Sequence, residues 1–157
     1  ESFNKKAFEE NIGSVNFVQD NESKSSRGVL RGLHFQTPPF DQAKLVRCIE
    51  GSVMDVAVDI RKGSPTYGKH VAIELSGENK RQLFVPRGFA HGFSVLSNTA
   101  VFAYKVDSAY APEYDSGIKY DDIDLNINWG LTDNEIQLSV KDKTLPSFKD
   151  LKSPFNF

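Results

Sequence analysis

The feature that most constrains the fold of this chain is a succession of short runs rich in β-branched, aliphatic and aromatic residues. Clusters of turn-forming residues separate many of these runs, among them Pro38-Pro39, Lys62–Pro65 and Ser76–Asn79. Many short strands with few helices between them favour a β-sandwich or a closed barrel. We therefore predict an all-β fold with strands within residues 14–19, 28–36, 44–60, 70–76, 82–86, 92–97 and 99–106.

The long run from 44 to 60 contains a turn signal and a strongly alternating segment. Glu50-Gly51-Ser52 predicts a hairpin turn between two strands. After it, Asp55 and Asp59 alternate with hydrophobic residues, which are Met54, Val56, Val58 and Ile60. Successive residues of a strand point to opposite faces. One face of this strand, the hydrophobic one, is therefore predicted to lie in the core.

Two segments outside the strands carry helical patterns. Phe8 and Ile12 are four residues apart and Gly13 follows them, which predicts one short helix within 3–12. A second short helical stretch is predicted near Asn134–Val140, followed by a polar tail. The 157 residues suit a single domain, 1–157, with one functional site.

The composition argues against several classes of function. A net charge of −2 without a basic stripe argues against nucleic-acid binding. No run approaches the roughly 18 apolar residues of a membrane-spanning helix, and the opening residues ESFNKK contain no apolar signal core. Cys48 is the only cysteine and lies in an apolar run, which favours a small buried residue. We expect a cytoplasmic protein.

Histidines are scarce, and two of the three stand beside glycines. His34 follows Gly32 in RGLHFQ, and His91 precedes Gly92 in AHGF. Glycine in a strand permits close backbone approach, so a neighbouring polar side chain can face a ligand. The alternative for both is a core histidine whose hydrogen bonds are satisfied. His70 alternates with Val71 and Ile73 on a predicted outer face, and we interpret it as structural.

The histidines do not form a convincing metal site. Barrels of this kind often hold a metal through a His-x-His pair, a carboxylate and a distant histidine, but the sequence has no His-x-His. His34 and His91 have no third histidine or suitably placed carboxylate to complete a ligand set. We expect no metal, which leaves both imidazoles available as an acid, a base or an anion contact.

Three further polar residues stand out in or next to predicted strands. Tyr104 shares a face with Phe102, so both core packing and proton donation inside a barrel fit its position. Tyr110 precedes Ala-Pro in a loop, where it could stack on a flat ligand or simply lie at the surface. Lys44 is predicted to lie on the same strand face as Val46 and Cys48. A lysine pointing inward would suit an anion or a developing oxyanion.

Several blocks of this sequence are familiar in their order and spacing. They are GVLRGLHFQ, KLVRC, DVAVDIR, ELSGENKRQLFVPRGFAHGF, the YK pair at 104–105 and LSVKD at 138–142. Together they resemble the dTDP-4-dehydrorhamnose 3,5-epimerase family across nearly the whole chain. This resemblance implies a metal-free enzyme on a cupin-type jelly-roll barrel (a double-stranded β-helix) with short flanking helices. It also implies a homodimer that converts dTDP-4-keto-6-deoxy-D-glucose into dTDP-4-keto-L-rhamnose. Proton transfer beside a ketone involves neither a redox change nor a covalent adduct, so we expect no cofactor.

The resemblance assigns chemical roles through the matching motifs. His34 matches the general base, Asp142 the carboxylate that orients it and Tyr104 the proton donor. Lys44 and Arg31 match groups around the sugar and the diphosphate, and Lys44 is the candidate to stabilise the enolate. An acid and a base together exceed what binding requires, which argues against a non-catalytic sugar-nucleotide-binding protein. Inversion at one centre only, or action on a related nucleotide sugar, stays open.

The resemblance also implies further ligand contacts. These match His91, Tyr110, Gln19, Asn21 and Lys141. Asp115 stands where the family usually has glutamate, so its reach is shorter. Glu1 matches a ligand-binding glutamate, but the arginine-glycine pair expected several residues before it does not occur in this sequence. We expect weaker diphosphate binding where that arginine is missing.

Overall fold

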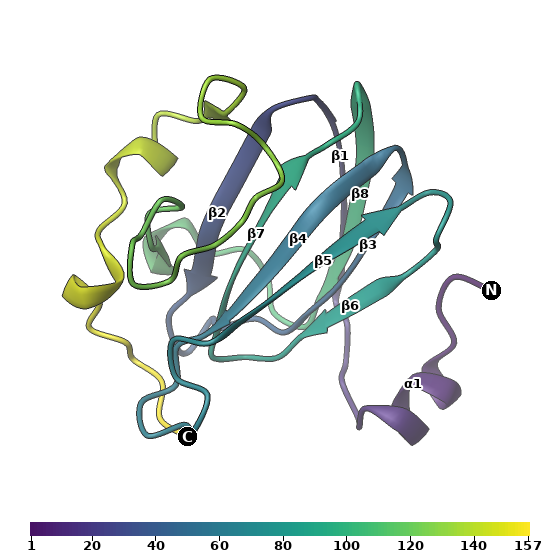
Figure 1. The fold of residues 1–157 in the computed structure, drawn as a ribbon. Helices are drawn as coiled ribbons and strands as arrows, with labels where there is room; N and C mark the ends of the chain where they lie inside the picture. The colour runs from purple at the N-terminus through teal and green to yellow at the C-terminus, as the bar shows by residue number, and fades with distance from the viewer.

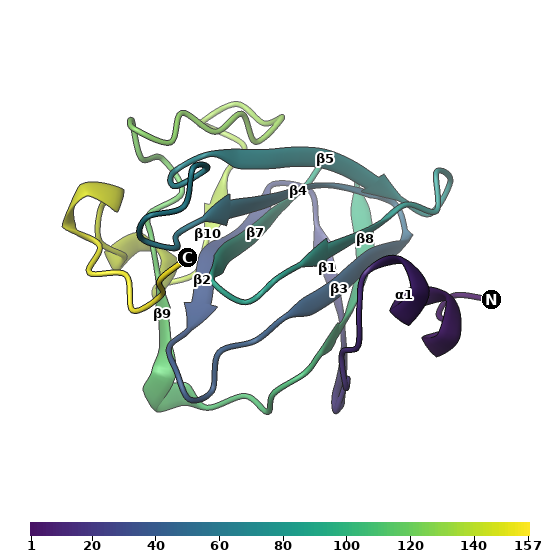
Figure 2. The same cartoon turned by 90° about the horizontal axis from the view of Figure 1, so that it is seen from below.

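Two β-sheets face each other and enclose the interior of a barrel (Figures 1 and 2). The computed structural model describes all residues from 1 to 157. One sheet has the strand order β1-β8-β3-β6, and the other has the order β10-β2-β7-β4-β5, with β9 also paired to β2. All pairings are antiparallel except the short parallel pair of β10 with β2. The predicted all-β barrel is therefore confirmed.

The strands have at most 8 residues, and the helices have at most 7. The strands are β1 Gln19–Ser26, β2 Val29–Gln36, β3 Lys44–Glu50, β4 Ser52–Asp59, β5 His70–Ser76, β6 Gln82–Val85, β7 Phe89–Val95, β8 Thr99–Val106, β9 Asp115–Gly117 and β10 Gln137–Leu138. The helices are α1 Lys5–Asn11 and single 3-10 turns at Pro112–Tyr114, Asp142–Thr144 and Phe148–Asp150. None of these helices is long and apolar enough to cross a membrane.

The hydrophobic residues form two clusters, one on each side of the six-stranded sheet. The cluster between the sheets includes Val46, Val53, Leu75, Phe93 and Phe102. The other includes Leu30, Val56, Val58, Ile118 and Trp129, and the C-terminal segment covers it (Figure 1). Because β4 lies between the clusters, both of its faces are buried, and Asp55 and Asp59 are 0% and 1% exposed. The hydrophobic face of this strand is core as predicted, but so is the aspartate face.

The turn at Glu50–Ser52 does not form the predicted hairpin. β3 belongs to the four-stranded sheet and β4 to the six-stranded sheet, so the chain crosses between the sheets here. Gly51 has a φ of +76°, and a Cβ atom at this position would lie 2.1 Å from the Thr99 carbonyl oxygen. The glycine therefore permits a tight crossing, which has the same local sequence signal as a hairpin.

The N-terminal segment forms the predicted helix but begins its strand later than expected. The Asn4 side chain accepts a hydrogen bond from the Ala7 amide at 3.1 Å and caps α1. Phe17 packs against Phe3 and Phe8, with ring centroids 5.6 and 5.5 Å apart. The hydrophobic run 14–19 thus holds α1, while the polar residues Gln19–Ser26 pair with β8 along their whole length.

No helix forms near Asn134–Val140, so that prediction is wrong. Thr132 donates hydrogen bonds to Glu135, whose carboxylate also pairs with Arg27 at 2.7 Å. The Gln137 amide donates to the Gly28 carbonyl at 2.8 Å and starts the short pairing of β10 with β2. These tertiary contacts outweigh the weak local helical pattern.

Candidate active site

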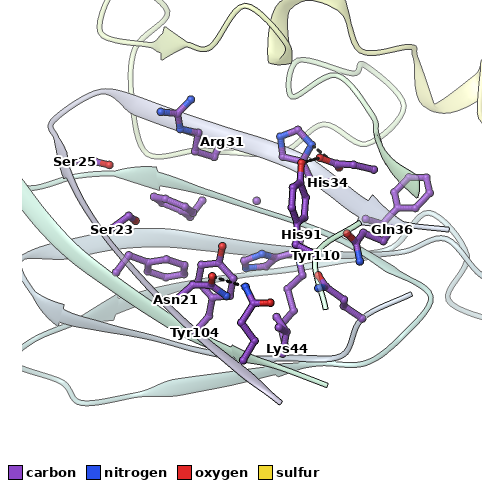
Figure 3. A pocket seen from close by; sticks show the side chains of 18 of the residues that line it. Asn21, Ser23, Ser25, Arg31, His34, Gln36, Lys44, His91, Tyr104 and Tyr110 are labelled. Carbon is purple, nitrogen blue, oxygen red and sulfur yellow. Dashed lines mark hydrogen bonds and ion pairs between the residues drawn. The ribbon is translucent and has the colours of Figure 1, made fainter. Parts of the chain in front are cut away.

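A cavity of about 570 Å³ opens between the two sheets (Figure 3). The strands β1, β2, β3, β7 and β8 supply most of its lining. The lining includes Gln19, Asn21, Arg31, His34, Lys44, His91, Tyr104, Tyr110 and Asp115. Nine of the residues singled out from the sequence therefore lie around one space.

His34 is held by a buried carboxylate from the C-terminal segment. Its Nε2 lies 2.6 Å from Oδ1 of Asp142, which is 1% exposed. Burial alone would raise the pKa of Asp142, but hydrogen bonds from His34, Ser139 and the Gly32 amide outweigh it and lower the pKa to about 2. Asp142 is therefore ionised at neutral pH and fixes the orientation of the imidazole.

The other nitrogen of His34 is free. An ionised carboxylate only accepts hydrogen bonds, so Nε2 carries the hydrogen that points to Asp142. The Nδ1 atom then holds a lone pair in the neutral imidazole, and it has no hydrogen-bond partner. Oδ1 of Asp115 lies 3.9 Å from it. This tautomer is the one required of a general base.

Tyr104 and Lys44 come from adjacent strands of the opposite sheet. Tyr104 on β8 pairs with Val46 on β3, two residues after Lys44. Burial, and then the charge of Asp115, raise the pKa of the Tyr104 phenol above its usual value of 10.0. Burial lowers the pKa of Lys44 from 10.5, while Asp115 and Asp55 partly oppose this shift. The phenol thus keeps its proton near neutral pH and can act as an acid.

His91 faces the same cavity and is held by a second buried carboxylate. It lies directly across from His34 in the pairing of β2 with β7. Its Nε2 is 3.0 Å from both carboxylate oxygens of Asp55, which is fully buried. Asp55 is a site residue that sequence reasoning missed. The available signal was a charged residue inside an otherwise apolar strand, where a carboxylate needs a partner.

Two glycines bring the histidine-bearing strands close together. A Cβ atom on Gly92 would lie 2.6 Å from the Arg31 carbonyl oxygen, and one on Gly32 would lie 2.6 Å from the Gly92 Cα atom. The register of β2 against β7 shifts between Arg31 and His34. The prediction that these glycines permit close backbone approach is confirmed.

The remaining predicted contacts lie at the sides and mouth of the cavity. Gln19 donates a hydrogen bond to Asn21 at 2.8 Å along the inner face of β1. Arg31 is half-exposed, and its guanidinium lies 3.9 Å from Asp142. Tyr110 is 57% exposed and donates to Asp115 at 3.0 Å. Lys141 is ion-paired with the same Asp115 carboxylate.

Two residues discussed from the sequence lie away from this cavity. Glu1 is exposed beside α1, where it accepts a hydrogen bond from Asn4 at 3.2 Å, so the structure does not bring it to the other site residues. His70 begins β5 and does not line the cavity. The chain also contains no cluster of three or more His, Cys, Asp or Glu side chains arranged to hold a metal ion.

Comparison with known proteins identifies the family. The family model for dTDP-4-dehydrorhamnose 3,5-epimerase matches residues 1–150. A dTDP-4-dehydrorhamnose 3,5-epimerase from Shigella flexneri is 60% identical over 130 residues, which cover 82% of this chain and 72% of the relative.

Solved structures agree in both fold and sequence. The dTDP-4-dehydrorhamnose 3,5-epimerase of Elizabethkingia anophelis superposes with a TM-score of 0.93 at 56% identity, covering 98% of this chain and 84% of that one. The dTDP-6-deoxy-D-glucose-3,5-epimerase of Legionella pneumophila, solved with dTDP-4-keto-L-rhamnose, has a TM-score of 0.96 at 49% identity and covers 100% and 84%. The cupin-type jelly roll is thereby confirmed. The chain belongs to the dTDP-4-dehydrorhamnose 3,5-epimerase family.

Proposed function

We propose that this protein inverts C3 and C5 of dTDP-4-keto-6-deoxy-D-glucose and so produces dTDP-4-keto-L-rhamnose. The observation that supports the proposal is that His34 and Tyr104, the proposed base and acid, line opposite walls of one cavity. His34, with its free Nδ1, comes from the six-stranded sheet, and Tyr104 comes from the four-stranded sheet (Figure 3). Inversion needs this arrangement because the proton must return from the face opposite to the one it left.

The reaction begins with removal of a proton beside the ketone. Hydrogens on C3 and C5 are acidic because the C4 ketone takes up the resulting charge as an enolate. His34 accepts the proton, and the ionised Asp142 at 2.6 Å stabilises the imidazolium. Lys44 supplies positive charge where the enolate oxygen develops. Loss of one such preorganised group typically costs about 2.7–4 kcal/mol of activation barrier.

Tyr104 then gives a proton to the other face of the carbon. Its raised pKa keeps the phenol protonated at neutral pH until the enolate requires the proton. C3 and C5 flank C4 symmetrically, so one base, one acid and one enolate site can serve both centres. Neither a redox change nor a covalent adduct enters the scheme, which therefore requires no cofactor.

The other predicted residues are proposed to hold the nucleotide-linked part of the substrate. Arg31 is half-exposed at the cavity wall and can form charge-assisted bonds to diphosphate oxygens. Polar and aromatic contacts are available from Gln19, Asn21, His91 and Tyr110. Lys141 is ion-paired with Asp115, which lines the same cavity. We also propose that residues 1–157 work as one domain, as a homodimer and in the cytoplasm.

Product analysis tests the proposal directly. The protein is incubated with dTDP-4-keto-6-deoxy-D-glucose in deuterium oxide, and the product is analysed by NMR and mass spectrometry. We expect deuterium and inverted configuration at both C3 and C5. Label and inversion at one carbon would establish a single-centre epimerase instead. A bound but unlabelled sugar would show a binding protein without turnover.

A further inference from the structure

Asp115, at the start of β9, is a carboxylate to which the scheme above gives no chemical role. Its Oδ2 accepts a hydrogen bond from the Tyr110 hydroxyl at 3.0 Å and is ion-paired with Lys141. Its Oδ1 forms no hydrogen bond and lies 3.9 Å from Nδ1 of His34. Tyr110 also points toward His34 in Figure 3. One oxygen of Asp115 is thus held in place, while the other faces the free nitrogen of the base.

A reaction at two carbons places a demand on this base. After the first abstraction His34 is an imidazolium and has no lone pair for a second proton. A sugar bound against Nδ1 would stand between this atom and the water of the cavity, and no protein group is hydrogen-bonded to Nδ1. A neighbouring group that accepts this proton would free Nδ1 for the second carbon while the sugar stays bound.

We propose that Asp115 takes this proton from His34 and releases it to solvent, which resets the base between the two inversions. The inference rests on the proposed two-centre reaction. The N–H bond at Nδ1 breaks as an O–H bond forms at Oδ1, and the carboxylic acid then gives its proton to a water molecule. Tyr104, a phenolate after the first inversion, regains a proton from water, so the site returns to its starting state. Oδ1 must move about 1 Å closer to Nδ1 to form this hydrogen bond. Catalytic hydrogen bonds that are long in a ligand-free site often tighten when substrate binds.

The surroundings of Asp115 suit this role. Tyr110, which is 57% exposed, connects the carboxylate to the mouth of the cavity and to water. On the inner side, the charge of Asp115 acts on both Tyr104 and Lys44. Burial raises the pKa of Tyr104, and Asp115 raises it further. Burial lowers the pKa of Lys44, and Asp115 opposes this shift. Asp115 therefore lies within electrostatic reach of the base, the acid and the cation.

The test separates the two proton abstractions in time. Asp115→Asn keeps the size and polarity of the side chain but removes its capacity to accept a proton from an imidazolium. Single-turnover reactions in deuterium oxide are quenched at increasing times, and singly and doubly labelled sugars are counted by mass spectrometry. We expect the first label at nearly the parent rate and the second at least tenfold more slowly, so that singly labelled sugar accumulates. Asp115→Glu should restore the parent ratio of the two rates.

A matched variant distinguishes proton transfer from a general effect of charge. Glu113→Gln removes an exposed carboxylate two residues before Asp115 that does not line the cavity, so its ratio of second to first rate should stay at the parent value. An unchanged ratio of the two rates in Asp115→Asn, or accumulation of singly labelled sugar in Glu113→Gln, would overturn the relay. Absence of a second label in the parent protein would instead overturn the proposed two-centre function.

Discussion

The site depends on single side chains whose charge is set by their neighbours, and Asp142 is the clearest case. It is almost completely buried, yet three hydrogen bonds keep it ionised. A buried carboxylate without such partners would instead take up a proton. Asp142 therefore fixes the tautomer of His34 and also links the folding of the C-terminal segment to β2.

This link predicts a specific pH dependence of stability. The pKa of Asp142 falls from 3.8 to about 2 on folding, so the unfolded state binds more protons between these values. The stabilisation is fully present above about pH 4 and is lost as the pH falls through about 2. It amounts to about 2 kcal/mol. We expect urea unfolding of the parent protein to lose this much stability relative to Asp142→Asn between pH 5 and pH 2.

The comparison with Asp142→Asn is needed because other carboxylates titrate in the same range. The pKa values of Asp59 and Glu135 are also lowered, but both groups are present in both proteins. Their contributions therefore cancel in the difference. An equal pH dependence in the two proteins would show that Asp142 is not the linked group.

The sequence predicted the direction of side chains along one strand better than it predicted contacts between residues of different strands. Lys44 shares a strand face with Val46, and Tyr104 shares one with Phe102. This alternation correctly predicted that both side chains lie inside the barrel. Asp55 was assigned only to the second face of its strand, because its bond to His91 depends on the register of β4 against β7. The link between His34 and Asp142 spans 108 positions and came from family resemblance, not from any local pattern.

At the scale of elements, the close pairing of β2 with β7 aligns the two histidines. Gly92→Ala would place a methyl group 2.6 Å from a backbone oxygen that has little freedom to move. We expect the unfolding free energy to fall by about 1–3 kcal/mol, as for overpacking. Turnover should fall as well, because the strands carrying His34 and His91 must separate.

Gly63→Ala is the control for this variant. Gly63 has a φ of +81° with nothing within 4 Å of an added Cβ atom, and it does not line the cavity. Strain in the left-handed region should cost roughly 1–2 kcal/mol of stability without loss of turnover. Full activity in Gly92→Ala would show that the close approach does not serve the site.

The elements that the sequence misplaced share one cause. The inner face of β1 is polar because Gln19, Asn21, Ser23 and Ser25 line the cavity. Most of this strand therefore lacks the hydrophobic pattern from which strands were predicted. The crossing at Gly51 has the local signal of a hairpin, and β10 exists only through its pairing with β2. In each case contacts between distant segments decided the structure, and a local pattern contains no information about them.

At the scale of the whole molecule, the open sheet edges predict a dimer. β1 and β6 end the four-stranded sheet, and β5 ends the other, so each has backbone groups without a strand partner on one side. An edge strand of this kind can pair with a second copy of the chain. Light scattering at micromolar concentration should give twice the 17.6 kDa of one chain. A monomer mass across that range would contradict the prediction.

The two-sheet architecture also underlies the central claim, that His34 removes the proton and Tyr104 returns one to the opposite face. In His34→Asn no group remains to take the proton, so both deuterium exchange and inversion should stop while the fold survives. In Tyr104→Phe the base and Lys44 remain, so exchange with retention should continue while inversion falls by about 10²–10⁴-fold.

The most direct measurement holds each folded variant with dTDP-4-keto-6-deoxy-D-glucose in deuterium oxide. NMR follows the label at C3 and C5 separately from the configuration of the product. We predict no label with His34→Asn, and label that outruns inversion with Tyr104→Phe. Normal exchange in His34→Asn, or inversion at the parent rate in Tyr104→Phe, would contradict the assignment and require a different pair of residues across the sugar.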